Sequence, residues 1–201
     1  LYPESLVVKL FCSTKPIKYL DQKYKKKKIL DLGCGNGRHS LLFNSLGFNT
    51  FPLETSKFIS LKVERLLNQK VYFGDSYNLP FKNKYFDYIF AFNSVYYVQE
   101  SKMRFSTILQ HIKSKLKKRG FFIFTLIGSK HSFIRKKKKV GRDKIIIKSD
   151  FLNFRNNTQI YYKKSFVKEI KENFNIKFEG ILIDKNKKFT RHLNYYVCQK
   201  V

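Results

Sequence analysis

Residues 29–40, ILDLGCGNGRHS, hold three glycines within five positions, directly after a short apolar run. Glycine weakens the interior of both strands and helices, so this cluster indicates a turn where the backbone approaches another group closely. The run predicts a strand over 28–32, and the segment after the glycines predicts a helix over 37–46 closed by Gly47. Strand, glycine turn and helix are the opening of a nucleotide-binding α/β domain, whose ligand lies at the carboxyl ends of the strands.

The spacing of the glycines limits the kind of ligand. The pattern is Gly33-x-Gly35-x-Gly37, whereas a dinucleotide fingerprint, GxGxxG, would place its last glycine at Arg38. The phosphate loop GxxxxGK[ST] is absent from the sequence. Both phosphate-binding interpretations are therefore weakened.

Strand-like and helix-like segments alternate along the rest of the chain. We predict helices over 4–20 with a break near Pro16, after Ser56 as N-cap, over 101–120 and over 165–174. Further strands are predicted over 48–54, 70–74, 85–93, 121–127, 175–183 and 193–200. Residues 128–162 are predicted to be irregular and polar, with a short strand candidate over 144–148. This alternation favours an α/β fold around a mostly parallel sheet.

Two carboxylates follow predicted strands. Glu54 ends the second strand, about 20 residues beyond the glycine turn, where a carboxylate can accept from both hydroxyls of a ribose. Asp75 ends the third strand, where it can accept from the exocyclic amine of adenine. Together with the glycines, these acids indicate an adenosyl ligand without a pyrophosphate.

Five segments, ILDLGCGNGRHS, GFNTFPLETS, GDSYNLPF, FDYIFAFNSVYYV and LKKRGFFIF, resemble in order and spacing the motifs of class I S-adenosylmethionine-dependent methyltransferases. The resemblance covers residues 28–127. It implies a Rossmann-like α/β fold with a seven-stranded sheet in the order 3-2-1-4-5-7-6, strand 7 antiparallel and helices on both faces. We predict a single domain over 1–201, with an N-terminal helical segment over 1–27 and an acceptor-side insertion over 128–162.

The resemblance also implies which residues contact S-adenosylmethionine or its product S-adenosylhomocysteine. Those expected along the methionine part are Asp31, Gly33, Cys34, Gly35 and Gly37. Glu54, where the family usually has aspartate, is expected to hold the ribose, Asp75 and Ser76 to flank the adenine, and Asn93 to lie near the sulfonium. Arg38 would either reach the methionine carboxylate or lie on a solvated helix face.

Several of these residues also have a purely structural interpretation. Asp31 could cap the following helix, Glu54 could be a solvated strand end, and Asp75 could cap a short turn. Cys34 is better explained as a small residue packed by the turn than as a reactive thiol.

Methyl transfer from a sulfonium mainly requires alignment and exclusion of water, and a base only where the acceptor is a poor nucleophile. His131, in the loop after the fifth strand, is a candidate base, although its loop also reads as a solvated basic segment. Tyr97 is the second candidate catalytic residue, as a wall of the acceptor pocket, with a core position as the alternative. The sequence has no cluster of His, Cys or carboxylates typical of a metal site.

The residues at the end of the predicted strand over 85–93 indicate which class of acceptor the protein methylates. Family members that methylate base amines commonly carry Asn/Asp-Pro-Pro-Tyr/Phe there, whereas this chain reads AFNSVYY. This favours a small-molecule or glycan-precursor acceptor. The alternatives are an RNA methyltransferase and a non-catalytic binding module with the same fold.

The net charge of +28 favours anionic partners, either RNA or the surface of an anionic membrane. Codon bias is the alternative origin, because lysine far outnumbers arginine and Asn, Ile, Phe and Tyr are also abundant. The sequence has no apolar run long enough for a transmembrane segment, and its start does not resemble a signal peptide. Its three cysteines form no CxxC pair, which favours a cytoplasmic location.

Overall fold

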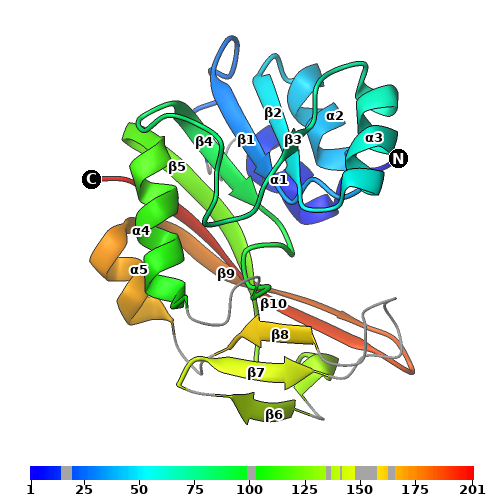
Figure 1. The fold of residues 1–201 in the computed structure, drawn as a ribbon, viewed down its shortest axis with the longest axis vertical. Helices are drawn as coiled ribbons and strands as arrows, with labels where there is room; N and C mark the ends of the chain where they lie inside the picture. Colours follow the sequence, from blue (N-terminus) through cyan, green and yellow to red (C-terminus); the bar gives the residue numbers. More distant parts are fainter. Residues whose placement is uncertain (15–19, 99–102, 135–136, 141, 148–157, 163–165) are drawn as a thin grey trace.

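The computed structural model describes residues 1–14, 20–98, 103–134, 137–140, 142–147, 158–162 and 166–201. Within these ranges, seven strands form one sheet in the order β3-β2-β1-β4-β5-β10-β9 (Figure 1). Their bounds are β1 Lys28–Leu32, β2 Asn49–Glu54, β3 Tyr72–Phe73, β4 Phe86–Ala91, β5 Leu116–Ile127, β9 Asn175–Lys185 and β10 Thr190–Gln199. Neighbouring strands from β3 to β5 are parallel, and β10 is antiparallel to both β5 and β9. Since β9 and β10 are the sixth and seventh strands of this sheet along the chain, the predicted order is confirmed.

Helices cover both faces of the sheet, as predicted (Figure 1). Helices α1 (Ser5–Cys12), α2 (Arg38–Ser45) and α3 (Lys57–Leu67) lie on one face, and α4 (Phe105–Lys115) and α5 (Val167–Asn173) on the other. On the first face, the rings of Phe11 in α1 and Phe90 in β4 lie 4.9 and 5.1 Å from the ring of Phe43 in α2. On the second, Phe122 in β5 lies 5.7 Å from Phe174 at the end of α5. Aromatic burial from both sides therefore holds the layers together.

Two predicted helices are shorter in the structure. The helix expected over 4–20 ends at Cys12, because Ser13 is extended; residues 15–19 lie outside the described ranges. The helix expected over 101–120 ends at Lys115, and Leu116 already pairs with Phe86 of β4. Sheet pairing thus overrides the helical tendency of the lysine-rich segment that follows.

Part of the segment predicted to be irregular forms a second sheet. Strands β6 (Lys137–Val140), β7 (Lys144–Ile147) and β8 (Thr158–Tyr161) pair antiparallel in the order β6-β7-β8, after a short 3-10 turn at Ser132–Ile134. Only the strand candidate over 144–148 was predicted, and it is confirmed over the described residues 144–147. Lysines dominate β6, and β8 reads Thr-Gln-Ile-Tyr, two polar residues followed by two larger apolar ones, so neither has the alternation that identifies a strand from sequence.

Strand β8 joins this second sheet to the loop that follows β4. The Tyr161 N–H donates to the Tyr96 carbonyl at 2.7 Å, and the Val98 N–H donates to the Gln159 carbonyl at 3.1 Å. These bonds bring β8 beside the carboxyl end of β4. In the part of the chain that the structure describes, no helix is both long and apolar enough to cross a bilayer.

Candidate functional site

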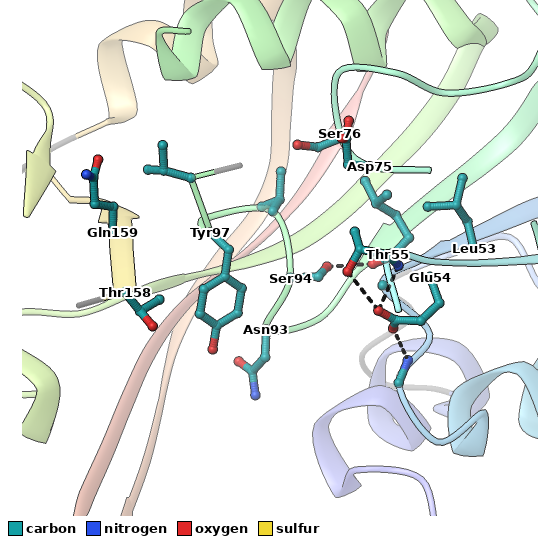
Figure 2. Close-up of a pocket in the computed structure, with 15 residues that line it drawn as sticks. Leu53, Glu54, Thr55, Asp75, Ser76, Asn93, Ser94, Tyr97, Thr158 and Gln159 are labelled. Carbon is teal, nitrogen blue, oxygen red and sulfur yellow. Dashed lines mark hydrogen bonds between the residues drawn. The ribbon is translucent and has the colours of Figure 1, made fainter. Parts of the chain in front are cut away.

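A cavity of about 470 Å³ lies at the carboxyl ends of β1, β2 and β4. This volume is in the range that holds small-molecule ligands. Figure 2 shows Glu54, Thr55, Asp75 and Ser76 at one end of the cavity, Tyr97, Thr158 and Gln159 at the other, and Asn93 and Ser94 between them. The remaining lining residues are Leu32, Gly33, Gly35, Leu53, Val95 and Val98.

The three glycines of the turn between β1 and α2 lie in three different surroundings. Gly33, Gly35 and Gly37 all have positive φ, at 74°, 53° and 79°. A Cβ on Gly33 would lie 2.5 Å from the Ser94 Cβ, and one on Gly37 would lie 2.9 Å from a methyl group of Val63. A Cβ on Gly35 would meet no atom within 4 Å, and Gly35 lines the cavity. The turn therefore packs tightly at its two ends and opens to the cavity at its middle.

Glu54, at the end of β2, connects the glycine turn to the loop before α3. The Gly35 N–H donates to one carboxylate oxygen at 3.0 Å, and the Thr55 N–H donates to the other at 2.8 Å (Figure 2). The side chain is only 9 % exposed. Since a carboxylate can accept about four hydrogen bonds, the oxygen that faces Gly35 retains room for a ligand hydroxyl.

Asp75 and Ser76 follow β3 and form the second polar group at this end of the cavity. The Asp75 Oδ1 accepts from the N–H groups of Tyr77 and Asn78 at 3.0 and 2.8 Å, so this oxygen holds the turn. No bond of the second oxygen, Oδ2, to a described residue is found. The Ser76 residue is buried and lines the cavity. The carboxylate therefore combines the structural role expected of a turn cap with a free acceptor beside the cavity.

Asn93 is held at the centre of the cavity by the neighbouring strand β5. Its backbone has a φ of 55°, and its N–H donates to the Thr125 hydroxyl at 2.9 Å. The same hydroxyl donates to the Asn93 Oδ1 at 3.3 Å. The next residue, Ser94, donates through its hydroxyl to the carbonyl of Leu32. These bonds fix the loop after β4 against the ends of β1 and β5.

The far end of the cavity is formed by Tyr97 and by the first two residues of β8. Tyr97 bridges to Ile160, and its ring lies 4.7 Å from that of Tyr96. Burial raises the pKa of the Tyr97 hydroxyl, so the group is neutral near pH 7 and serves as a hydrogen-bonding partner rather than a phenolate. Thr158 and Gln159 add neutral polar groups beside it.

Four predicted cofactor residues do not line the cavity. Asp31 is buried under the turn and accepts from the Ser40 hydroxyl at 2.6 Å; burial, with the nearby charge of Glu54, raises its pKa to about 7. Cys34 is 4 % exposed, and burial raises the pKa of its thiol, as expected for a packed residue. Gly37 packs against α3. The Arg38 guanidinium lies 2.9 Å from Glu4.

The structure does not bring His131 to the cavity. Its side chain is 4 % exposed, its Nδ1 accepts from the Phe133 N–H at 3.2 Å, and its ring packs against Phe133 and Phe189. Burial, with the nearby His192 and Arg191, lowers its pKa to about 4. An uncharged, enclosed imidazole of this kind supports the loop after β5.

Eight lining residues were not predicted: Leu32, Leu53, Thr55, Ser94, Val95, Val98, Thr158 and Gln159. Thr55 and Ser94 directly follow predicted site residues, so their position beside a strand end could have identified them. Thr158 and Gln159 reach the cavity only through the pairing of β8, for which the sequence carries no signal. No group of three or more His, Cys, Asp or Glu side chains suited to a metal ion occurs in the described ranges.

Comparisons with known proteins agree on the fold. Residues 30–124 match the family model described as a methyltransferase domain. A search of curated proteins gave no match. Among solved structures, a S-adenosylmethionine-dependent methyltransferase from Methanosarcina mazei is 16 % identical, with a TM-score of 0.74 over 100 % of this chain and 99 % of that one. A putative S-adenosylmethionine-dependent methyltransferase from Listeria monocytogenes is 15 % identical, with a TM-score of 0.69 over 90 % and 94 %.

A third solved structure carries a bound product of the cofactor. It is the 1,6-didemethyltoxoflavin-N1-methyltransferase of Burkholderia thailandensis, determined with its substrate and S-adenosylhomocysteine. It is 13 % identical to this chain, with a TM-score of 0.60 over 88 % of this chain and 72 % of that one. Residues 30–124 thus match a methyltransferase domain, and the strand order and the glycine turn with its two strand-end carboxylates agree with the fold of the S-adenosylmethionine-dependent methyltransferases that the chain is similar to.

Proposed function

We propose that the cavity binds S-adenosylmethionine with its adenosine at the Glu54 and Asp75 end, and that the methyl group passes to a small-molecule or glycan- or lipid-precursor acceptor at the β8 end. The observation that carries this proposal is the division of one cavity into two chemically different ends. Carboxylates lie at one end and neutral hydrogen-bonding groups at the other.

The residues at the first end fit the cofactor. Glu54 has acceptor capacity left for the ribose hydroxyls, and the Oδ2 of Asp75 can accept from the adenine amine beside Ser76. At Gly33 and Gly35, the backbone borders the cavity without side chains, which leaves room for the amino-acid part of the ligand. Asp31 and Arg38 would then act indirectly, by supporting the turn.

The residues at the centre and at the second end are suited to aligning an acceptor. Bound S-adenosylmethionine supplies a methyl group already activated by the positive charge on its sulfur. Asn93, fixed by Thr125, lies between the two ends, where it can orient the reacting groups for an in-line displacement. Tyr97, Thr158 and Gln159 can hydrogen-bond an acceptor and exclude water. His131 has no part in this mechanism, because it is buried and does not line the cavity.

The experiment that tests the activity is transfer of a labelled methyl group from S-adenosylmethionine into cell extract, separated into RNA, lipid, glycan and small-molecule fractions. We expect label in the lipid, glycan or small-molecule fraction.

Binding is tested by calorimetry with S-adenosylhomocysteine, where we expect Glu54→Gln and Asp75→Asn each to weaken affinity by about tenfold. Asp184→Asn is the matched control, because this carboxylate is 67 % exposed and lies in β9.

An RNA acceptor is the second candidate, supported by the net charge of +28 and by the exposed lysines Lys138 and Lys139 of β6. Label confined to the RNA fraction would favour it over the first candidate. Binding of S-adenosylhomocysteine without label in any fraction would instead support a non-catalytic binding module.

A further inference from the structure

Exposed apolar side chains gather on α3 and on the adjoining strand β3. Phe58, Leu61, Leu66 and Phe73 are 67, 50, 47 and 66 % exposed, and Ile59 is 36 % exposed. These five residues, which we call the α3–β3 face, are five of the eleven exposed large apolar side chains in the described ranges. Because they fall within 17 consecutive residues, 57–73, the exposure is concentrated rather than scattered.

The five side chains belong to the side of the sheet that α3 covers. In α3, Ser60 and Val63 are buried toward the sheet, which turns Phe58 and Leu61 outward. Val71 packs with Val63, and side chains two residues apart in a strand share a face, so Phe73 lies on the side of β3 that α3 covers. Figure 1 shows α3 at the outer edge of the sheet, away from β6, β7 and β8.

Positive charges are interleaved with these apolar side chains. Lys57, Lys62, Arg65 and Lys70 are all exposed, and the Lys62 ammonium lies 4.1 Å from the centre of the Phe58 ring. The one acid within 57–73, Glu64, is half-buried and accepts from the Val71 N–H at 3.0 Å. The α3–β3 face is therefore both apolar and cationic.

We propose that the α3–β3 face docks the protein on the surface of an anionic membrane. Apolar side chains can enter the boundary between headgroups and acyl chains while lysine and arginine contact the lipid phosphates. A second copy is a poor occupant, because each chain carries a net charge of +28. The face also adjoins the cavity at both ends, since α3 begins three residues after Glu54 and β3 ends two residues before Asp75. This inference does not depend on the proposed acceptor.

The test is sedimentation of the full chain with phosphatidylcholine vesicles, with and without phosphatidylserine, at low and high salt. We expect binding only to the phosphatidylserine vesicles at low salt. The triple variant Phe58→Ser, Leu61→Ser, Phe73→Ser should lower the partition coefficient at least about tenfold, and Lys62→Gln with Arg65→Gln several-fold. All of these side chains are exposed and none lines the cavity, so S-adenosylhomocysteine binding should be unchanged and reports intact folding.

Two control variants match these changes elsewhere on the surface. Ile181→Ser with Ile183→Ser removes exposed apolar groups from β9, and Lys138→Gln with Lys139→Gln removes exposed charges from β6. Both controls should bind vesicles within about twofold of the unmodified chain. Equal losses in the controls, or no dependence on phosphatidylserine, would overturn the proposal. So would a triple variant that keeps vesicle binding but loses self-association or binding to a protein partner.

Discussion

The Glu54 carboxylate contacts the glycine turn on one side and the loop before α3 on the other. The extra methylene of glutamate, compared with the aspartate usual in the family, extends the reach of the carboxylate toward the Gly35 N–H, which donates to it at 3.0 Å. One side chain thus sets the position of the turn and borders the cavity. At the residue scale, binding and local folding are coupled through this group, so variants of the turn should affect both.

Gly33 and Gly35 allow these two effects to be separated. Both have positive φ, so alanine at either position should cost about 1 kcal/mol of unfolding free energy from backbone strain. At Gly33 a Cβ would also lie 2.5 Å from the Ser94 Cβ, and we expect Gly33→Ala to lose about 2–3 kcal/mol in total. At Gly35 the Cβ meets no protein atom but borders the cavity, so Gly35→Ala should mainly weaken S-adenosylhomocysteine binding.

Urea unfolding and calorimetry measure the two quantities on the same pair of variants. Each variant is the control for the other, because the strain is shared and the contacts differ. Equal losses of stability in Gly33→Ala and Gly35→Ala would contradict the packing described for the turn.

At the scale of elements, the N-terminal helix α1 is attached to the sheet by both packing and charge. Leu6, Val7, Leu10 and Phe11 are buried beneath it. Ahead of its first turn, the Glu4 carboxylate accepts from Arg38 at 2.9 Å and from both terminal nitrogens of Arg191 in β10 at 2.9 and 3.0 Å. The Arg38 side chain, which the sequence offered as a ligand for the methionine carboxylate, is therefore engaged in anchoring α1.

Substitution of Glu4 tests this anchor. Burial alone would raise the Glu4 pKa, but the hydrogen bonds and charge of Arg191, with Arg38, lower it overall from its ordinary value of 4.5. A lowered folded-state pKa contributes stability above about pH 4.5 that is lost as the pH falls through the folded value. We expect Glu4→Gln to cost about 1–2 kcal/mol of unfolding free energy at pH 7 and to speed hydrogen exchange in α1.

The difference between Glu4→Gln and the unmodified chain should shrink as the pH is lowered from 7 through 4.5 toward 3. Asp184→Asn is the matched control, because Asp184 lies 3.5 Å from the same Arg191 but is 67 % exposed, and we expect a change below about 0.5 kcal/mol. A pH-independent difference would show that the charge of Glu4 is not what anchors α1.

The elements differ in how far the sequence predicts them. From β1 through α3, the glycine turn, the Ser56 cap and the apolar strands are local signals, and the predicted elements are confirmed to within a few residues. The end of α4 could not be predicted, because Leu116 joins the sheet through pairing with β4, which is distant in sequence. Strands β6 and β8 depend on each other through β7 and have no pattern of their own.

The same distinction holds for the site. Gly33, Gly35, Glu54, Asp75, Ser76 and Asn93 lie at or directly after predicted strand ends, and each lines the cavity. Asp31, one residue before the end of β1, accepts from Ser40 in α2, whereas the next residue, Leu32, lines the cavity, because alternate strand residues face opposite sides of the sheet. Thr158 and Gln159 depend on the non-local pairing of β8 with the loop after β4, so only the structure could place them.

At the scale of the whole molecule, the charge of the chain and the charge of the cavity have opposite signs. The chain contains 42 lysines and arginines and carries a net charge of +28. Among the described residues that line the cavity, none is lysine, arginine or histidine, and the two charged ones, Glu54 and Asp75, are acids. The positive charge is therefore excluded from the described cavity wall, which disfavours ligands that carry phosphate there.

This contrast predicts which adenosine compounds stabilise the protein. S-adenosylhomocysteine should raise the unfolding free energy by about 2.7 kcal/mol at a concentration 100 times its dissociation constant, because it binds only the folded state. ATP has the same adenosine, but its triphosphate would meet a wall with two carboxylates and no cation. We expect ATP to stabilise only weakly, through surface lysines, and only at low salt. Thermal unfolding with each compound at low and high salt measures the difference, and adenosine, which lacks both the amino acid and the phosphates, serves as the control. If ATP matched S-adenosylhomocysteine at high salt, a phosphate site would have to exist in or beside the cavity, and the assignment of its two acidic groups to an adenosyl ligand without phosphates would fail.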